Sequence, residues 1–333
     1  MSESPRVFAT RALSAAVPAA LHALEDLARH CEVEAWPTRE KPSPEQLAVR
    51  AAAAEGLLCL LTDRIDAALL ARCPRLRAIS SVSVGVDHVD LDAATARGIP
   101  VGHTPGVLTE TTADLAFALL LAAARRVAEG DRFVRAGLWT PERIWEPDML
   151  LGRDVHGATL GLVGLGAIGQ AMARRAHGFG MRVLAWSRTR RDVPGVDFVS
   201  LESLLAAADF VSVHVALTTE TRGLLGGAAI AQMKRGAVLV NTARGGIVDE
   251  NALADALRSG RIASAGLDVF AREPLDAASP LRALPNVVLT PHIGSASEAT
   301  RARMVDLAVK NLLAALAGER MPHCANPAVY AAS

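Results

Sequence analysis

The sequence predicts an α/β fold built from two doubly wound domains, each with a parallel sheet and helices on both of its faces. Runs rich in β-forming residues alternate with helical patterns along most of the 333 residues, which is typical of parallel sheets. The alternation occurs twice, and the second series opens with a long apolar helical segment that starts near residue 109. A chain of this length also suits two domains better than a single hydrophobic core.

The first series contains five short segments with strand character and three with helix character. The expected strands are residues 7–10, 33–36, 57–61, 78–82 and 99–102. The expected helices are residues 21–28, 44–54 and 91–96. A sheet of this kind binds ligands at the carboxyl ends of its strands.

The long helical segment that opens the second series has charges suited to a helix dipole. Thr109 or Thr111 is the expected N-cap, Glu110 lies in the first turn, and arginines lie near the end. Residues 115–121 are apolar nearly all round, so the helix must be buried on several sides. It is either part of a dimer interface or an ordinary buried helix.

Six further strands are expected in order, which completes a second doubly wound sheet. They are residues 159–163, 182–186, 210–213, 237–241, 263–267 and 287–289. The helical stretch 298–317 is expected to return to the first domain. The substrate-binding domain would then comprise residues 1–105 completed by 295–333, and the dinucleotide-binding domain residues 106–294. Hinges would lie near residues 104–107 and 293–297, beside the interdomain cleft that is the default site.

A glycine motif stands between the strand 159–163 and an alanine-rich helical segment. Gly164 allows a tight turn, Gly166 lets the backbone approach a pyrophosphate, and Gly169 lets helix and strand pack closely. The helix N-terminus then faces the anion. The alternative, a glycine-rich turn without a ligand, is less favoured in this strand–turn–helix context. The expected pyrophosphate-binding residues are Gly164, Leu165, Gly166, Ala167, Ile168 and Gly169.

The end of the second strand of this domain indicates which dinucleotide binds. An Asp or Glu at this position would bind the ribose 2′-hydroxyl and repel a 2′-phosphate, but neither is present about twenty residues beyond the glycines. Ser187, Arg188 and Thr189 instead offer donors for a phosphate. We therefore expect NADP(H), with NAD(H) as the second choice, against the alternative of a solvated basic turn.

Composition excludes several classes of protein. The chain has 35 basic and 35 acidic residues, so it lacks the excess of positive charge that is typical of proteins that bind nucleic acid or an anionic membrane. The four scattered cysteines lack the spacing of a zinc site or a disulfide framework, and no metal is expected. The apolar run 115–124 is too short to span a bilayer. A cytoplasmic enzyme is expected.

Three polar residues follow predicted strands of the second domain. Arg244 comes after the strand 237–241, Glu273 after 263–267, and His292 after 287–289. Each alone has an ordinary structural explanation. Together, at carboxyl strand ends beside a dinucleotide-binding motif, they predict a catalytic group.

Several motifs give the chain a family resemblance over almost its whole length. They are residues 83–90, 164–169, 241–249, 266–274 and 290–297. With these motifs the sequence resembles the D-isomer-specific 2-hydroxyacid dehydrogenases, and most of all their glyoxylate/hydroxypyruvate reductases. Ala216 departs from the family, which often has Pro there. The resemblance implies a Rossmann coenzyme domain inserted in a flavodoxin-like substrate domain.

The resemblance also implies roles for individual residues. His292 would donate a proton to the forming alkoxide, Glu273 would hold the imidazole, and Arg244 would bind the substrate carboxylate and polarise its carbonyl. The backbone of Val84 and Gly85 would bind the same carboxylate from the substrate domain.

Further cofactor and substrate contacts follow from the same resemblance. Asp268 would contact the nicotinamide carboxamide, Thr242, Ala243 and Gly294 would flank its ring, and Thr112 is a weaker candidate for the cofactor. Leu60 stands where phosphoglycerate-type relatives place an Arg, so its apolar side chain favours small unphosphorylated acids. Trp139 would reach a neighbouring subunit's cleft, or else simply pack within its own chain.

The predicted function is therefore that of an oxidoreductase, which reduces glyoxylate to glycolate and hydroxypyruvate to D-glycerate with NADPH. The alternatives are 2-ketogluconate reduction or another D-2-hydroxyacid dehydrogenase activity of the same fold. A dinucleotide-sensing binding protein is less favoured, since Arg244, Glu273 and His292 are all present. A homodimer is expected.

Overall fold

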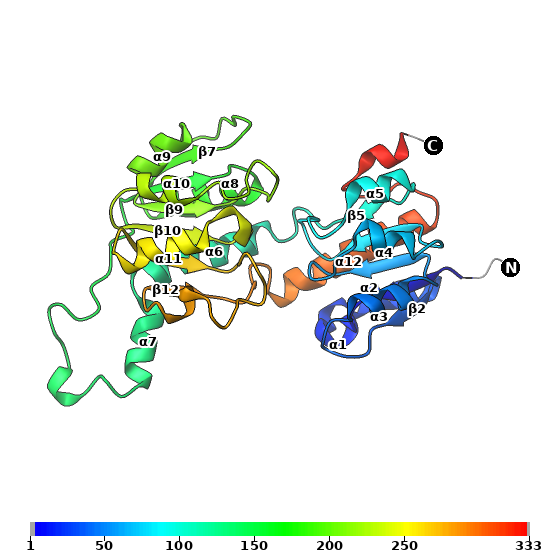
Figure 1. Cartoon of the computed structure of the whole chain (residues 1–333), viewed down its shortest axis with the longest axis horizontal. Coiled ribbons are helices and arrows are strands. Elements are labelled where there is room, and N and C mark those ends of the chain that lie inside the picture. The colour runs from blue at the N-terminus through cyan, green and yellow to red at the C-terminus, as the bar shows by residue number, and fades with distance from the viewer. Residues whose placement is uncertain (1–3, 332–333) are drawn as a thin grey trace. The chain divides into compact units, whose positions relative to one another are not determined.

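The computed structural model describes residues 4–331, which form two compact units (Figure 1). Unit 1 runs to Leu108 and resumes at Ser295, whereas unit 2 is Thr109–Gly294. The sequence placed the first boundary after residue 105 and the second after residue 294. The chain therefore leaves unit 1, forms unit 2 and returns to unit 1.

Unit 1 contains a five-stranded parallel sheet with the strand order β2-β1-β3-β4-β5, which is the flavodoxin-like order. Its strands are β1 (Arg6–Ala9), β2 (Glu32–Ala35), β3 (Gly56–Cys59), β4 (Ala78–Ser81) and β5 (Val101–Gly102). Its helices are α1 (Leu13–Ala16), α2 (Leu21–His30), α3 (Pro44–Ala51), α4 (Ala67–Ala71), α5 (Leu91–Ala96) and α12 (Glu298–Leu316), with 3₁₀ turns at Pro18–Ala20 and Pro327–Tyr330. Every residue of β3 and β4 is buried, as expected for central parallel strands.

Helix α12 packs on β3 and β4 in unit 1. The Ser80 hydroxyl on β4 donates a 2.8 Å hydrogen bond to the carbonyl of Ala308 in this helix. Gly102 on β5 lies against Asn311, and a Cβ at position 102 would stand 2.8 Å from the Asn311 Cβ. The segment after residue 294 is thus an integral part of unit 1.

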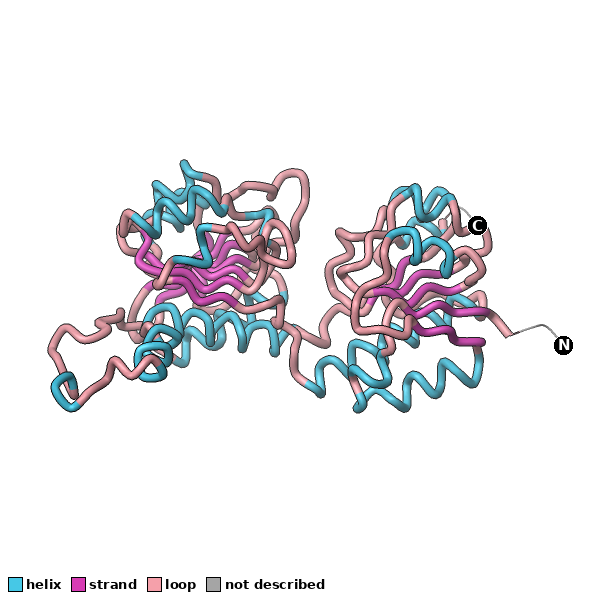
Figure 2. The backbone as a smooth tube through the Cα atoms, turned by 60° about the horizontal axis from the view of Figure 1, so that its bottom comes forward, coloured by secondary structure: helices cyan, strands magenta, loops and turns pink. Residues whose placement is uncertain are grey.

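Unit 2 contains a seven-stranded parallel sheet in the order β12-β11-β10-β9-β6-β7-β8. Its strands are β6 (Thr159–Val163), β7 (Arg182–Trp186), β8 (Val196–Phe198), β9 (Phe210–Val213), β10 (Ala237–Asn241), β11 (Ile262–Leu267) and β12 (Val287–Leu289). Its helices are α6 (Thr109–Ala124), α7 (Val127–Arg135), α8 (Ala167–Gly178), α9 (Leu201–Ala207), α10 (Gly227–Gln232) and α11 (Glu250–Arg258), with 3₁₀ turns at Pro141–Arg143, Gly245–Ile247 and Pro280–Ala283. Both sheets lie between layers of helices, which confirms the predicted fold class (Figure 2).

Among the elements that the sequence did not predict are β8, a three-residue edge strand, and the short helices α1 and α4. Segments of this length contain less than two periods of any hydrophobic pattern, so their sequence signal is weak. None of these three omissions affects the carboxyl edges of the sheets.

Helix α6 is mostly buried by its own unit. It packs against β10, β11 and α8, and half of its sixteen residues are buried. Asp114 and Ala118 remain exposed. Packing inside unit 2 accounts for the buried half of α6, and a part for this helix in a dimer interface stays a prediction.

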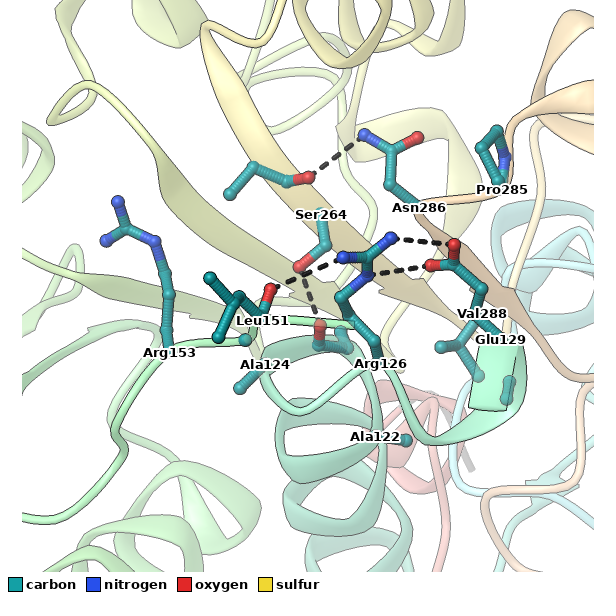
Figure 3. Close-up of a pocket in the computed structure, with 14 residues that line it drawn as sticks. Ala122, Ala124, Arg126, Glu129, Leu151, Arg153, Ser264, Pro285, Asn286 and Val288 are labelled. Carbon is teal, nitrogen blue, oxygen red and sulfur yellow. Dashed lines mark hydrogen bonds and ion pairs between the residues drawn. The ribbon is translucent and has the colours of Figure 1, made fainter. Parts of the chain in front are cut away.

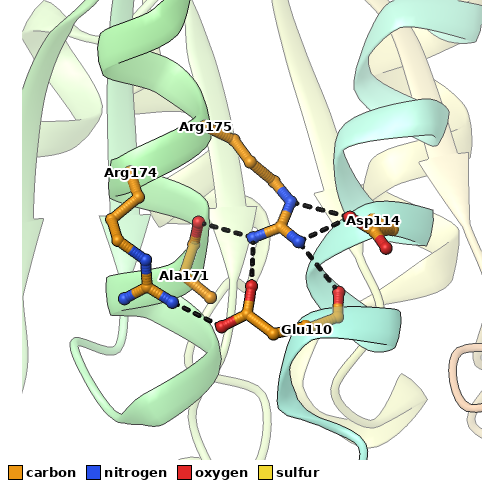
Figure 4. Close-up of polar contacts among 5 residues, drawn as sticks. All are labelled: Glu110, Asp114, Ala171, Arg174 and Arg175. Atoms are coloured by element: carbon orange, nitrogen blue, oxygen red, sulfur yellow. Dashed lines mark hydrogen bonds and ion pairs between the residues drawn. The ribbon is translucent and has the colours of Figure 1, made fainter. Parts of the chain in front are cut away.

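Charged side chains join the start of α6 to α8 (Figure 4). Arg175 Nη1 lies 2.9 Å from a Glu110 oxygen, and Arg175 Nε lies 2.9 Å from Asp114 Oδ1. Arg174 pairs with the other Glu110 oxygen. Such exposed ion pairs stabilise the folded protein by about 0.2–1 kcal/mol each. They join α6 to α8, the helix that begins at the glycine motif.

Residues 127–151 form an arm that projects from the body of unit 2 (Figure 1). The arm begins after Arg126, which adopts a left-handed φ of 54° and separates α6 from α7. Helix α7 buries none of its residues. Trp139, Ile144 and Trp145 on the arm are exposed, Trp145 to 76%. Clustered exposed apolar side chains of this kind mark an interaction surface.

No helix within residues 4–331 is both long and apolar enough to cross a membrane.

Candidate active site

The glycine motif adopts the geometry that each of its glycines requires. Gly164 has a left-handed φ of 108°, and a Cβ there would lie 2.6 Å from the carbonyl carbon of His214. A Cβ at Gly169 would overlap the Gly164 carbonyl oxygen. A Cβ at Gly166, in contrast, would meet no atom within 4 Å. The first and third glycines thus pack the turn, and the second leaves open space beside the N-terminus of α8, where a pyrophosphate binds in such folds.

A second feature of this edge suits a bound dinucleotide. The hydroxyl of Thr242, just beyond β10, is buried and has no hydrogen-bond partner within the described chain. Buried polar groups are nearly always hydrogen-bonded, so an unsatisfied hydroxyl in a binding edge fits a ligand that supplies the missing partner. The open space at Gly166 and the Thr242 hydroxyl therefore both fit a nicotinamide dinucleotide.

The predicted phosphate-binding residues follow β7 and are open to solvent. The side chain of Arg188 is 67% exposed, and its closest acid is Glu220 at 4.0 Å. The Ser187 hydroxyl donates to the Thr189 carbonyl at 2.6 Å. The exposed ion pair holds Arg188 weakly, which leaves the guanidinium able to turn toward a phosphate.

His292 and Glu273 form a short hydrogen-bonded pair. The Nδ1 of His292 donates to Glu273 Oε2 at 2.7 Å, and the other carboxylate oxygen accepts from the Phe270 N–H at 3.0 Å. His292 has a left-handed φ of 54°, which is uncommon for a residue with a side chain. Burial raises the pKa of Glu273, but these hydrogen bonds and the charges of His292 and Arg244 outweigh it, so this pKa lies below its usual value. Glu273 is thus held as a carboxylate that fixes the ring and leaves Nε2 as the atom that can exchange a proton.

Arg244 lies close enough for its charge to help lower the pKa of Glu273, and the glycine that follows it brings its loop there. A Cβ at Gly245 would overlap the backbone of Phe270, so the loop after β10 lies directly against the loop after β11. Asn241 holds the same turn: its Nδ2 donates to the Arg244 carbonyl at 2.9 Å, and its Oδ1 accepts from the Ala243 N–H at 3.0 Å. The structure therefore brings together the three polar strand-end residues that the sequence singled out.

Asp268 lies at the end of β11 and is fully buried. Its Oδ1 accepts hydrogen bonds from the Thr290 hydroxyl at 2.6 Å and the Ile293 N–H at 2.8 Å, and its Oδ2 accepts from the Gly294 N–H at 2.8 Å. Burial raises the pKa of Asp268 above its usual value despite these donors. Thr112 stands next to Gly294: a Cβ at Gly294 would lie 3.6 Å from the Thr112 hydroxyl. Asp268 thus anchors the loop that carries His292, and its contact with the nicotinamide stays a prediction.

The predicted substrate contacts Leu60, Val84 and Gly85 belong to unit 1. Leu60 follows β3, and its N–H donates to the buried carboxylate of Asp63 at 2.8 Å. Val84 and Gly85 follow the neighbouring strand β4 and are half-buried. All three therefore lie at the carboxyl edge of the unit 1 sheet.

A cavity of about 350 Å³ lies at the opposite edge of the unit 2 sheet, beside the base of the arm (Figure 3). Its walls include Arg126, which pairs with Glu129 at 2.7 Å, and Ser264, which donates to the Ala123 carbonyl at 3.0 Å. Asn286, before β12, lies on the same wall. The cavity is distinct from the strand ends that carry the predicted site.

The described residues contain no cluster of three or more His, Cys, Asp or Glu side chains arranged to hold a metal ion. All four cysteines are free thiols.

Known proteins match the chain over almost its full length. The family model described as D-isomer specific 2-hydroxyacid dehydrogenase, NAD binding domain, matches residues 117–294. A glyoxylate reductase of Korarchaeum cryptofilum is 49% identical over 98% of this chain and 97% of its own length.

The chain belongs to the D-isomer-specific 2-hydroxyacid dehydrogenases.

Two solved structures extend the comparison to the dehydrogenase's fold. A protein of Thermus thermophilus has a TM-score of 0.89 and 52% identity, covering 96% of this chain and 99% of its own. An NADPH-dependent glyoxylate/hydroxypyruvate reductase of Sinorhizobium meliloti, solved with NADP and malonate, has a TM-score of 0.85 and 34% identity, covering 97% of both chains. The predicted family resemblance is thereby confirmed.

The sequence analysis did not identify every residue that positions the loops at the carboxyl edges of the two sheets. Asn241 and Gly245, which place Arg244, lie inside a noted motif without an assigned role, and His103 was not noted at all. Ala216, the departure from the family, lies in a loop that Thr221 closes: the Thr221 hydroxyl donates to the Ala216 carbonyl at 2.6 Å. The loop at Ala216 is thus held by a local hydrogen bond.

Proposed function

We propose that this dehydrogenase reduces small 2-oxo acids, converting glyoxylate to glycolate and hydroxypyruvate to D-glycerate, with NADPH as the reductant. The observation that supports this most directly is the 2.7 Å contact of His292 with Glu273, beside Arg244. An oriented imidazole and a guanidinium are the groups that carbonyl reduction of a carboxylic acid requires. The name of the Korarchaeum relative points to glyoxylate, and that of the Sinorhizobium structure points to glyoxylate, hydroxypyruvate and NADPH.

The reaction needs a proton for the carbonyl oxygen and a counter-charge for the carboxylate. His292, protonated on Nε2, gives its proton to the oxygen that becomes the hydroxyl. Glu273 keeps Nδ1 as the donor of the 2.7 Å hydrogen bond, so it stabilises the charged ring before transfer and holds the ring plane afterwards. Arg244 binds the substrate carboxylate and polarises the carbonyl. The bound nicotinamide supplies the hydride to C2 of the acid.

The cofactor would lie along the carboxyl edge of the unit 2 sheet. Residues 164–169 would bind the pyrophosphate, and Ser187, Arg188 and Thr189 the 2′-phosphate. Thr242, Ala243, Asp268, Gly294 and Thr112 would surround the nicotinamide. Since no carboxylate follows β7, NAD(H) would be bound less tightly rather than excluded.

The acid itself would be held from unit 1. The backbone at Val84 and Gly85 would bind the carboxylate, and Leu60 would form an apolar wall that disfavours phosphorylated acids. A carboxylate-binding backbone beside an apolar wall predicts small, unphosphorylated 2-oxo acids as substrates.

Initial rates over a panel of 2-oxo acids with both cofactors test the proposal. We expect glyoxylate and hydroxypyruvate to have the highest kcat/KM, with NADPH favoured over NADH. A higher kcat/KM for 2-ketogluconate or pyruvate than for glyoxylate and hydroxypyruvate would show that the proposed substrates are wrong. No turnover with any acid, despite tight NADPH binding, would favour a dinucleotide-sensing protein.

We also propose that the dehydrogenase works as a homodimer whose interface includes the arm. Trp139, Ile144 and Trp145 are all exposed within one protomer, and burying aromatic side chains is the main source of affinity in protein interfaces. The cavity beside the arm base would lie near the same interface. A second copy of this chain is the partner that the exposed apolar side chains of the arm favour.

A further inference from the structure

An ion pair joins the two loops that flank the glycine motif of unit 2. In the sheet, β6 lies between β7 and β9. The glycine motif follows β6, Arg188 follows β7, and Glu220 follows β9. The Nη1 atom of Arg188 lies 4.0 Å from Glu220 Oε2. The pair therefore connects the neighbours of the proposed pyrophosphate site, at the edge where a dinucleotide binds in such folds.

Glu220 is held in place more firmly than Arg188. Its Oε2 accepts a 2.6 Å hydrogen bond from the Thr218 hydroxyl. Buried Thr221 closes the turn around it: the Thr221 hydroxyl accepts from the Thr218 N–H at 2.8 Å and donates to the Ala216 carbonyl at 2.6 Å. Arg188, in contrast, has no side-chain hydrogen bond and no other ion pair within residues 4–331. When a ligand binds, the guanidinium is therefore the group that moves.

Glu220 is a carboxylate at neutral pH. The hydrogen bonds from Thr218 and from its own backbone, together with the charge of Arg188, keep the pKa of Glu220 below its usual value. A 2′-phosphate brings about 1.5 to 2 further negative charges to the same edge. The carboxylate and the phosphate would therefore compete for one guanidinium and would also repel each other.

We propose that Glu220 is a specificity-determining residue for the cofactor, because it pairs with Arg188 in place of the 2′-phosphate and so weakens the preference for NADPH over NADH. The inference rests on the proposed function, in which Arg188 binds the 2′-phosphate. With NADH bound, the ion pair stays intact. With NADPH bound, Arg188 leaves Glu220 for the phosphate, so selectivity reflects only the difference between these two interactions.

Cofactor binding to Glu220→Gln, followed by the fluorescence of the reduced nicotinamide, tests the competition. We expect the Kd for NADPH to fall by about three- to fivefold, which is the size of the exposed ion pair that no longer has to break. The Kd for NADH should change by less than about 1.5-fold, because its 2′-hydroxyl carries no charge and does not compete for Arg188.

A ligand without nicotinamide and a matched variant sharpen this test. Adenosine 2′,5′-bisphosphate, followed by calorimetry, should show the same gain in affinity as NADPH, because it carries the same phosphate. Asp197→Asn also removes one exposed carboxylate from unit 2, but Asp197 pairs with Arg182 at 2.8 Å, at the other end of β7. This control variant should bind NADPH like the wild type.

Two further measurements separate competition from a change in packing. In an Arg188→Ala background, most of the gain from Glu220→Gln should vanish, because no guanidinium is left to release. In about 1 M salt, where charges are screened within about 3 Å, the wild type and Glu220→Gln should bind NADPH with nearly equal Kd. A difference caused by packing would persist in both conditions.

The outcomes distinguish this inference from the proposed function. An unchanged Kd for NADPH in Glu220→Gln, an equal gain for NADH, or an equal gain in Asp197→Asn would overturn the inference and leave the proposed reduction of 2-oxo acids intact. Undiminished NADPH affinity in Arg188→Ala would place the 2′-phosphate elsewhere, and the inference would fall with that assignment. The measurements need no turnover, so they decide the role of Glu220 even if the wild type reduced no 2-oxo acid.

Discussion

Gly245 lies so close to Phe270 that a Cβ at position 245 would overlap the Phe270 backbone. This contact joins the loops after β10 and β11 and brings Arg244 beside Glu273. The absence of a side chain at Gly245 therefore allows Arg244 to lie beside Glu273 in the proposed catalytic group.

Gly245→Ala should displace Arg244 and lower kcat/KM for glyoxylate by at least about a hundredfold, the typical cost of losing one preorganised electrostatic donor. The melting temperature should fall as well, since two backbone segments must separate. Gly246→Ala is the control, because its Cβ would stand 3.4 Å from its closest neighbour. Full activity of Gly245→Ala would show that Arg244 does not depend on this packing.

His292→Gln should lower kcat for glyoxylate by about 10²–10⁴-fold, the usual contribution of a general acid. NADPH binding, followed by its fluorescence, should keep a nearly unchanged Kd because the substitution removes no predicted phosphate contact. A variant with wild-type kcat would mean that another group supplies the proton.

Glu273 should stabilise the folded protein in a pH-dependent way. Burial raises its pKa, but the hydrogen bonds and neighbouring cations bring the folded value below the unfolded 4.5. The stabilisation is thus present above about pH 4.5 and is lost as pH falls through the lower folded pKa. Urea unfolding of wild type and Glu273→Gln should show a difference in unfolding free energy that shrinks as pH falls below about 4.5. A difference independent of pH would contradict the ionised pair.

Arg188→Ala should raise KM for NADPH by about tenfold or more while KM for NADH changes little, because only NADPH carries the 2′-phosphate. Arg182→Ala is the matched control: it removes an exposed arginine from the other end of β7, where Arg182 pairs with Asp197 at 2.8 Å. Equal loss with both cofactors would place the phosphate-binding group elsewhere.

Ile144→Ser combined with Trp145→Ser should shift the protein from dimer to monomer, because the arm would lose its most exposed apolar side chains. Light scattering coupled to size exclusion measures the mass. Val49→Ser in unit 1 is the control, since Val49 is also exposed. A wild-type monomer at micromolar concentration would contradict the proposed dimer.

The sequence predicted the features that depend on local chemistry. Gly164 and Gly169 stand where a Cβ would clash, and Gly166 leaves open space beside the N-terminus of α8, so the strand–turn–helix unit could be recognised from the sequence. The strand ends at Arg244, Glu273 and His292 could be grouped because parallel strands place their carboxyl ends on one edge.

The remaining features depend on contacts between distant segments. Nothing near Ser83 in the sequence shows that His103 Nδ1 lies 2.9 Å from the Val84 carbonyl oxygen, because that contact is set by the neighbouring strand β5. The apolar stretch of α6 left two explanations open, because its sequence does not show which elements or subunits cover it. Burial patterns cannot tell which partner covers an apolar surface.

Asp268 bonds to the N–H groups of Ile293 and Gly294, which are the last two residues of unit 2. The carboxylate of Asp268 therefore ties the loop that carries His292 to the end of β11. The imidazole and a dinucleotide bound along this edge would both be held by unit 2, so their alignment would not depend on unit 1.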